Sequence, residues 1–295
     1  MANKKHKQRK GFWSYLMWLL LMSLALATGA RGEDRALLIG VGRYANFDER
    51  LNGVNRDLAM MTDVARIMGF KPHEIKVLEN ETASTTRVNA EFENWLIKDS
   101  GPNDRVLIYF SGHGSQVPDE NNDEKDQFDE VLLLHDVSLI QRHGRQTLTG
   151  VLHDDHFNRL LSRIQSRNIM VFLDACHSGS ATRNMRLESR SIALNDAQVK
   201  YFYYSPMLEA AGGSGSFDVM EPESASAVHG GYVAITACRD DEKTVTTSRG
   251  SIFTQGLRDV MHAAARSGDD ITPDEIQRRT THFIQTSIHT AGDVF

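Results

Sequence analysis

A thiol and an imidazole follow directly on a fully apolar run in the sequence. The run Ile169–Leu173 continues into "DACHSG", which contains Asp174, Cys176 and His177. A thiol attacks as its thiolate, and a neighbouring base can take or stabilise the proton. The stretch therefore predicts nucleophilic chemistry at Cys176 and raises the question of which histidine assists it.

A second histidine lies at the end of another apolar run. Arg105–Phe110 continues into "SGHGS", which contains Ser111 and His113. Ligands of open α/β sheets bind beyond the carboxyl ends of the strands, so neighbouring strands here would bring His113 to face Cys176. His177 competes for the role, but successive residues leaving a strand point to opposite sides, which favours His113.

Glycines around these residues leave backbone amides accessible, and several readings of the site stay open. We expect the amides of Gly114 and Cys176 to form an oxyanion hole. A cysteine after a buried strand can also be a core residue, and Cys176 could form a disulfide with Cys238, the second of two cysteines. A metal site of His113, Cys176 and His177 lacks the paired short spacings of zinc sites.

The elements that would position these residues alternate in the manner of an α/β protein. Apolar runs predict strands over Arg35–Val41, Ile75–Glu79, Arg105–Phe110, Glu130–His135, Ile169–Leu173 and Gly231–Ala237. Three- and four-residue spacing predicts helices over Leu51–Met68, Thr86–Lys98, Asp154–Gln165, Ile252–Ala265 and Pro273–Ile288. Continuous apolar strands between helices predict a mostly parallel central sheet with helices on both faces.

The first thirty residues have the layout of a secretory signal. Five basic residues precede the apolar segment Phe12–Ala27, and the small residues of "ALATGA" follow. Cleavage after Ala27 or Ala30 predicts a periplasmic or secreted protein, and retention predicts an anchor with the domain facing outside. Only the uncleaved form would contact a membrane. Removal of the five positive charges takes the net charge from −6 to −11, which argues against nucleic acid as a partner.

A long segment, 183–230, separates the remaining domain, 34–295, into a larger part, 34–182, and a smaller part, 231–295. Its "GGSGS" and scattered small residues predict an exposed loop. Four basic residues follow Cys176 within it, at Arg183, Arg186, Arg190 and Lys200.

Four motifs together resemble the metacaspases, the caspase-fold cysteine peptidases found outside animals, in their bacterial type. They are "LNGVNRD", "YFSGHGSQ", "DACHSG" and "GSIFTQGL", spread over a resemblance that runs from Arg35 to Asp293. The resemblance implies a caspase-like three-layer α/β sandwich and a catalytic dyad of Cys176 and His113. No cofactor is required by the predicted chemistry.

The resemblance also implies cleavage after arginine or lysine in peptide or protein substrates. The pocket positions that match the family's are Asp57, Ser111 and Asp174, and two carboxylates beside the nucleophile suit a basic side chain. Asp57 alone could equally be a solvated charge on a helix face. The same preference makes Arg183, Arg186, Arg190 and Lys200 candidates for self-cleavage.

Calcium binding is a further expectation from the resemblance. Many metacaspases bind Ca²⁺ through carboxylates that match Asp129, Asp154 and Asp155, together with an acid shortly after the nucleophile, where this chain has Arg183. The run Asp119–Glu130 copies the acid spacing of an EF-hand but lacks its glycine and its flanking helices, so we reject an EF-hand. A solvated acidic loop explains the run equally well.

Two other functions compete with a peptidase for basic residues. A catalytically silent caspase-fold module would use the acidic pocket to bind basic peptides, although an intact cysteine and histidine pair argues against it. A legumain-like peptidase of the same clan would cut after asparagine, against which the pocket carboxylates argue.

Overall fold

The computed structural model describes residues 32–119, 128–142, 144–176, 196–202, 232–237 and 244–292. The predictions for the N-terminal segment 1–30 and for His177, Arg183, Arg186, Arg190 and Cys238 lie outside these residues. No helix within the described ranges is long and apolar enough to cross a membrane.

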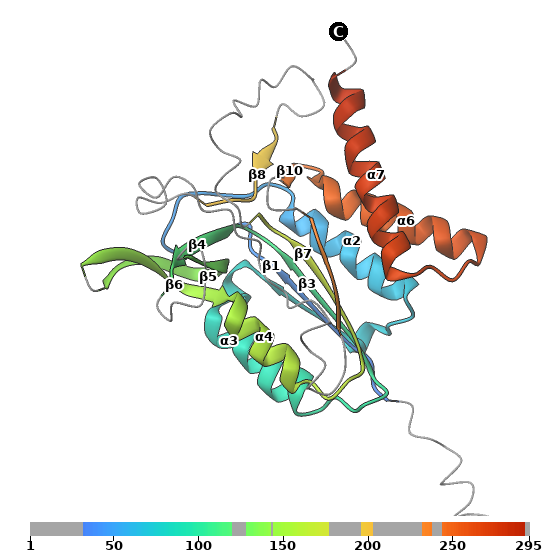
Figure 1. The fold of residues 1–295 in the computed structure, drawn as a ribbon, viewed down its shortest axis with the longest axis horizontal. Coiled ribbons are helices and arrows are strands. Elements are labelled where there is room, and N and C mark those ends of the chain that lie inside the picture. The colour runs from blue at the N-terminus through green and yellow to red at the C-terminus, as the bar shows by residue number, and fades with distance from the viewer. Residues whose placement is uncertain are drawn as a thin grey trace, which may run out of the picture.

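A five-stranded parallel sheet forms the centre of the molecule (Figure 1). Its strands are β1 (Arg35–Gly40), β2 (Ile75–Glu79), β3 (Arg105–Ser111), β7 (Asn168–Asp174) and β9 (Tyr232–Thr236), in the order β2-β1-β3-β7-β9. Every neighbouring pair is parallel. The apolar runs of the three inner strands, β1, β3 and β7, are buried on both sides, as expected of a parallel sheet covered by helices.

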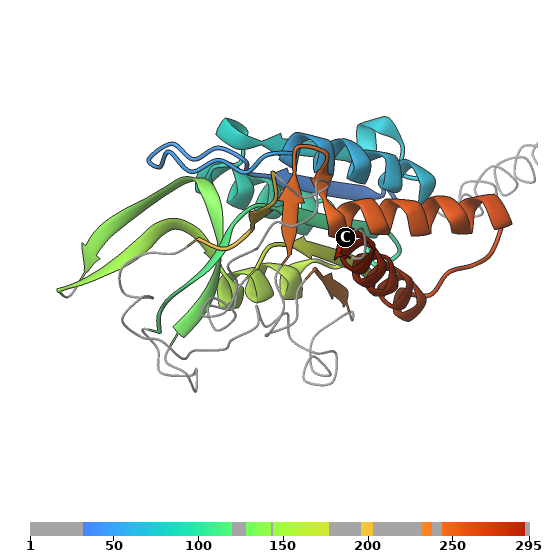
Figure 2. The ribbon, with the colours of Figure 1, turned by 90° about the horizontal axis from the view of Figure 1, so that it is seen from above.

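Helices cover both faces of this sheet, as Figures 1 and 2 show. One face carries α2 (Val54–Ile67), α6 (Ile252–Ser267) and α7 (Pro273–Gly292), and the other carries α3 (Thr85–Glu91) and α4 (Asp154–Arg163). Alternate strand residues supply the two cores: Leu37 and Ile39 belong to the α3/α4 side, whereas Ala36 and Leu38 belong to the α2/α6 side. The predicted three-layer sandwich is therefore confirmed.

The remaining helical turns are short. They are η1 (Pro72–Glu74), η2 (Asn80–Thr82) and the π-helical turn η3 (Phe92–Ile97), which continues directly from α3. The single helix predicted over Thr86–Lys98 is thus α3 followed by η3.

The apolar run Glu130–His135 does not join the parallel sheet as we expected. It lies in β5 (Phe128–Arg142), the middle strand of an antiparallel sheet with β4 (Gly114–Pro118) and β6 (Arg145–His153). This sheet extends to one side of the central sheet (Figures 1 and 2). The apolar pattern was misleading because a buried strand has the same continuous apolar sequence in a parallel and in an antiparallel sheet.

A small antiparallel sheet lies beyond the carboxyl ends of the central strands. It consists of β8 (Gln198–Val199), β10 (Val245–Thr247) and β11 (Gly250–Ser251), in the order β11-β10-β8. The expectation of an exposed loop over 183–230 is therefore wrong for Lys200, Tyr201 and Phe202, which are buried. Pairing with β10 is the physical reason, because a paired strand has its backbone groups satisfied inside the fold.

Candidate active site

The two reactive stretches lie at the same edge of the central sheet. β3 and β7 are neighbours, with Ser111 opposite Asp174 in the register. Beyond this pair, the amide of Gly112 donates to the carbonyl of Asp174 over 3.4 Å. His113 and Cys176 lie just beyond these residues, so the topology brings two residues that are 63 positions apart in the sequence to the same edge of the sheet.

The carbonyl oxygen of Lys200 lies between the two amides that the sequence analysis proposed as an oxyanion hole. The amide of Gly114 donates to this oxygen over 2.9 Å and the amide of Cys176 over 3.2 Å. Two backbone amides that converge on one carbonyl oxygen are the arrangement of an oxyanion hole. The bond that this carbonyl belongs to joins Lys200 to Tyr201.

The side chain of Lys200 fills the acidic pocket that was predicted for basic substrates. Its Nζ lies 3.1 Å from an Asp57 oxygen, 2.9 Å from an Asp174 oxygen and 2.8 Å from Ser111 Oγ. Both carboxylates and the ammonium are fully buried. Asp57, Ser111 and Asp174 therefore line one pocket, and the reading of Asp57 as a solvated helix charge is wrong.

Burial and the ion pairs act in opposite directions on the lysine. Burial lowers the pKa of Lys200, but the attraction of Asp174 and Asp57 outweighs it and holds the pKa above its ordinary value. Burial also raises the pKa of Asp57, assisted by repulsion from Asp174 and opposed by the Lys200 charge. The Lys200 ammonium thus favours the charged form of Asp57 in this buried pocket.

Asp174 is held in place by four hydroxyl groups, three of them from the last part of the chain. Ser251 Oγ donates over 2.9 Å and Thr254 Oγ1 over 2.7 Å, while Tyr109 and Thr244 donate over 3.3 Å. This set of donors fixes the direction of the carboxylate.

His113 is buried against aromatic rings. Its ring stacks on Tyr44 with 5.5 Å between centroids, and its amide donates to the Tyr44 hydroxyl over 2.9 Å. Burial and the nearby Lys200 charge lower the pKa of His113 to about 3, so the imidazole is neutral while the pocket is filled. Among the described residues, none hydrogen-bonds its buried Nδ1.

Cys176 is likewise buried, with 1 % of its surface exposed. The amide of Thr244 donates to its sulfur over 2.8 Å. The same Thr244 accepts the Lys200 amide through its carbonyl over 3.2 Å. Thr244 therefore contacts both the thiol and the residue whose carbonyl faces it.

Sequence reasoning missed several of these contributors. The sequence did not predict that Lys200 occupies the pocket. Nor did it point to the residues that contact His113, Cys176 and Asp174, which are Tyr44, Thr244, Ser251 and Thr254. The one usable signal was the stretch "QVKYF", in which a lysine is set among residues that favour strands, inside an otherwise loop-like segment.

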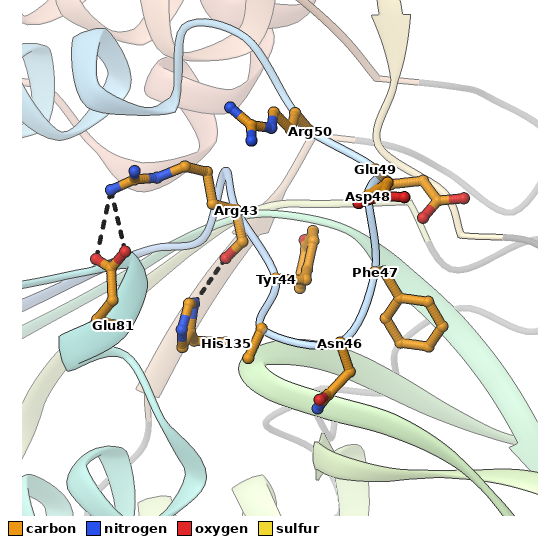
Figure 3. A pocket seen from close by; sticks show the side chains of 10 residues that line it. Arg43, Tyr44, Asn46, Phe47, Asp48, Glu49, Arg50, Glu81 and His135 are labelled. Atoms are coloured by element: carbon orange, nitrogen blue, oxygen red, sulfur yellow. Dashed lines mark hydrogen bonds and ion pairs between the residues drawn. The ribbon is translucent and has the colours of Figure 1, made fainter.

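A cavity of about 540 Å³ lies beside the site, under the loop that follows β1 (Figure 3). The backbones of Arg43 and Arg50 form an antiparallel bridge at the base of this loop, and the loop carries Tyr44 and Phe47. The Arg43 side chain also forms an ion pair with Glu81 over 3.2 Å. The loop thus joins the histidine side of the site to the entrance of the pocket.

The residues proposed for calcium are not gathered into one cluster. Asp129 lies 3.6 Å from His153, and Asp155 lies 3.9 Å from Arg159 while its amide donates to Asp154. Within the described ranges, no three acidic, histidine or cysteine side chains group closely enough to hold a metal ion. Calcium binding at Asp129, Asp154 and Asp155 stays a prediction.

A parallel α/β sandwich with a thiol and an imidazole at adjacent strand ends defines a caspase-like fold. The family model described as "Caspase domain" (Peptidase C14) matches residues 33–287. The chain therefore belongs to the caspase domain family.

The chain is also similar to individual proteins, in sequence or in structure. Metacaspase-1A of Aspergillus niger is 32% identical over 158 residues, and Metacaspase-1 of Emericella nidulans is 29% identical over 157. Each match covers 51% of this chain but only 37% of the relative, so the shared part is little more than a third of those proteins. A crystal structure of a protein from Geobacter sulfurreducens shares the fold at a TM-score of 0.58, with 20% identity over 84% of this chain and 88% of that one.

Proposed function

We propose that this protein is a cysteine endopeptidase that cleaves after lysine or arginine, with Cys176 as nucleophile and His113 as its acid and base. The observation that carries the proposal is the placement of Lys200. Its carbonyl accepts from the amides of Gly114 and Cys176, and its ammonium lies against Asp57 and Asp174. The carbonyl of a basic residue thereby lies at the proposed oxyanion hole while its ammonium lies in the acidic pocket, as the proposal requires of a bound substrate residue.

The reaction follows from these positions. Neutral His113 takes the thiol proton as the sulfur of Cys176 attacks the carbonyl carbon, and the amides of Gly114 and Cys176 stabilise the oxyanion. His113 then gives the proton to the departing amine, and the acyl group remains on the sulfur as a thioester. Water, deprotonated by His113, releases the acid and restores the thiol.

The proposal also makes Lys200 the site of self-cleavage, at its bond to Tyr201. The segment around it covers the cleft, since Cys176 and His113 are only 1 % and 6 % exposed. Cutting the Lys200–Tyr201 bond would leave two fragments joined through the central sheet, because β9 lies after the cut and pairs with β7 before it. The new ends can then leave the cleft and admit other substrates.

We also propose, from the signal-like segment 1–30, that the peptidase is exported or anchored with its domain facing outside. Recovery of the full-length chain from the cytoplasmic fraction would contradict this.

Fluorogenic peptides that differ only in the residue before the cleaved bond test the specificity. Lysine and arginine peptides should be hydrolysed with kcat/KM at least about 10²-fold above methionine, glutamine or aspartate peptides, because a neutral or acidic side chain leaves the buried carboxylates unpaired. Equal rates for lysine and its near-isostere methionine would refute the acidic pocket as the specificity determinant.

The depressed pKa of His113 predicts a loss of stability in acid. The imidazole of the unfolded chain takes up a proton near pH 6.5, whereas the buried one does so only near pH 3. The contribution of neutral, buried His113 to the free energy of unfolding is therefore fully present above about pH 6.5. It falls by up to about 1.4 kcal/mol per pH unit as the pH drops towards 3.

Denaturant unfolding between pH 7 and pH 4 measures this effect. The protein should carry Cys176→Ala so that Lys200 stays in the pocket, and His113→Gln in that background should remove the extra slope. A His113→Gln protein with the same pH slope as its parent would show that His113 is protonated in the folded chain.

A further inference from the structure

The residue two positions before Lys200, and so the third before the Lys200–Tyr201 bond, is held through its side-chain amide. Gln198 Oε1 accepts from the Asn52 amide over 2.7 Å, and its Nε2 donates to the Arg50 carbonyl over 2.8 Å. Both partners are backbone groups, one a donor and the other an acceptor. Only a side chain that offers an acceptor and a donor together satisfies both.

The residue two positions after the same bond is held through an aromatic ring. Phe202 packs on Phe47 with 4.8 Å between ring centroids, and 6.1 Å separate it from the His113 ring. Its amide donates to the Gly114 carbonyl over 2.9 Å, and its carbonyl accepts from Ser115 Oγ over 2.8 Å. Phe202 is 6 % exposed, so this position is a built subsite with both backbone and ring recognition.

One loop provides both contacts. The segment 43–52 leaves β1, carries Phe47 at its outer bend and returns to Arg50 and Asn52, as Figure 3 shows for the residues up to Arg50. It is closed at its base by the bond from the Leu51 amide to the Gly42 carbonyl, 2.9 Å long. The two subsites therefore have a fixed separation across the cleaved bond.

We propose that this loop selects substrates on both sides of the cleaved bond. The preferred class is peptides with glutamine two residues before the basic residue and an aromatic residue two residues after it. Phe47 is the specificity-determining side chain on the far side, and the backbone of Arg50 and Asn52 reads the glutamine. This inference rests on the proposed function, since it describes the substrate of the same site.

Competing internally quenched peptides test the proposal. The parent peptide contains Gln-Val-Lys-Tyr-Phe and is mixed with versions that carry Ala or Glu for Gln, or Ala for Phe. The ratio of kcat/KM between peptides in one tube does not depend on how many enzyme molecules still have Lys200 in the cleft. We expect losses of about fivefold for Gln→Ala, as much or more for Gln→Glu, and about tenfold for Phe→Ala.

Enzyme variants then assign the aromatic subsite to Phe47. With Phe47→Leu, the preference for Phe over Ala should fall from about tenfold to about threefold or less, whereas Phe47→Tyr should retain it because the ring remains. Asp48→Asn, at the exposed neighbouring position, should keep the wild-type ratio and serves as the matched control.

Each outcome bears on one of the two proposals. If lysine peptides are cut but the Gln and Phe replacements change the ratio by less than twofold, the loop is not a specificity element. An unchanged Phe-over-Ala ratio in Phe47→Leu also overturns the assignment. If no lysine peptide is cut, the proposed function itself fails, and this inference fails with it.

Discussion

Replacing Cys176 with alanine is expected to leave the chain uncut at Lys200 and to lower kcat/KM for lysyl peptides by at least about 10³-fold. The reason is that no other nucleophile among the described residues follows a strand end beside the Gly114 and Cys176 amides. The backbone of the variant keeps both amides, so Lys200 should stay bound in the cleft while the covalent step is lost. Peptide hydrolysis and gel analysis of the incubated chain measure the two effects.

This variant also separates the peptidase from a silent module that binds basic peptides. A module would bind a basic peptide equally well with or without the thiol and would never hydrolyse it. Retained hydrolysis in Cys176→Ala would rule out the thiol as nucleophile. Serine in place of the cysteine is the matched control for volume, since it replaces the thiol with a hydroxyl of nearly the same shape.

Replacing Asp174 with asparagine should lower kcat/KM for lysyl peptides by about 10²–10³-fold while changing that for a glutamine peptide far less. Asp174 is buried, and its two oxygens accept from Ser251 and Thr254 besides the Lys200 ammonium. The amide removes the charge and turns one acceptor into a donor that faces those hydroxyls. Lysine selectivity should therefore collapse, together with some stability.

The test compares kcat/KM for the lysine peptide with kcat/KM for the glutamine peptide. A loss of folded enzyme lowers both values equally, so their ratio does not depend on it. Asp63→Asn serves as the control, because Asp63 pairs with Arg258 and His262 on the outer surface of α2 and α6. An Asp174→Asn enzyme with wild-type selectivity would assign the recognition of the basic side chain elsewhere.

The central sheet could be predicted because burial on both faces leaves an apolar run that no half-exposed strand shows. Cys176 and His113 could be placed at one edge for the same reason, since parallel strands end together. The antiparallel sheet around β5 could not, because its buried centre has the same composition as the parallel strands. Its partner strand β4 begins at Gly114, directly after the histidine, where composition suggested only a turn.

The occupant of the pocket could not be predicted from pattern alone. Lys200 belongs to a five-residue segment whose strand is too short for a periodic signal, and its burial depends on Asp57, Ser111 and Asp174 from three distant elements. Its residue type nevertheless agreed with the pocket, which is why it was among the candidates for self-cleavage. Tyr44 escaped notice because stacking on a histidine leaves no trace in spacing.

The position of the self-cleavage site tests the central claim most directly. Purified protein is incubated, and the new amino terminus is determined by intact mass and terminal sequencing, beside a Lys200→Met chain and a Lys200→Arg chain. The structure predicts a fragment that begins at Tyr201 in the native and Lys200→Arg proteins and no such cut in Lys200→Met. A chain that stays whole, or a Tyr201 terminus that persists in Lys200→Met, would contradict the assignment of Lys200 as the bound substrate residue.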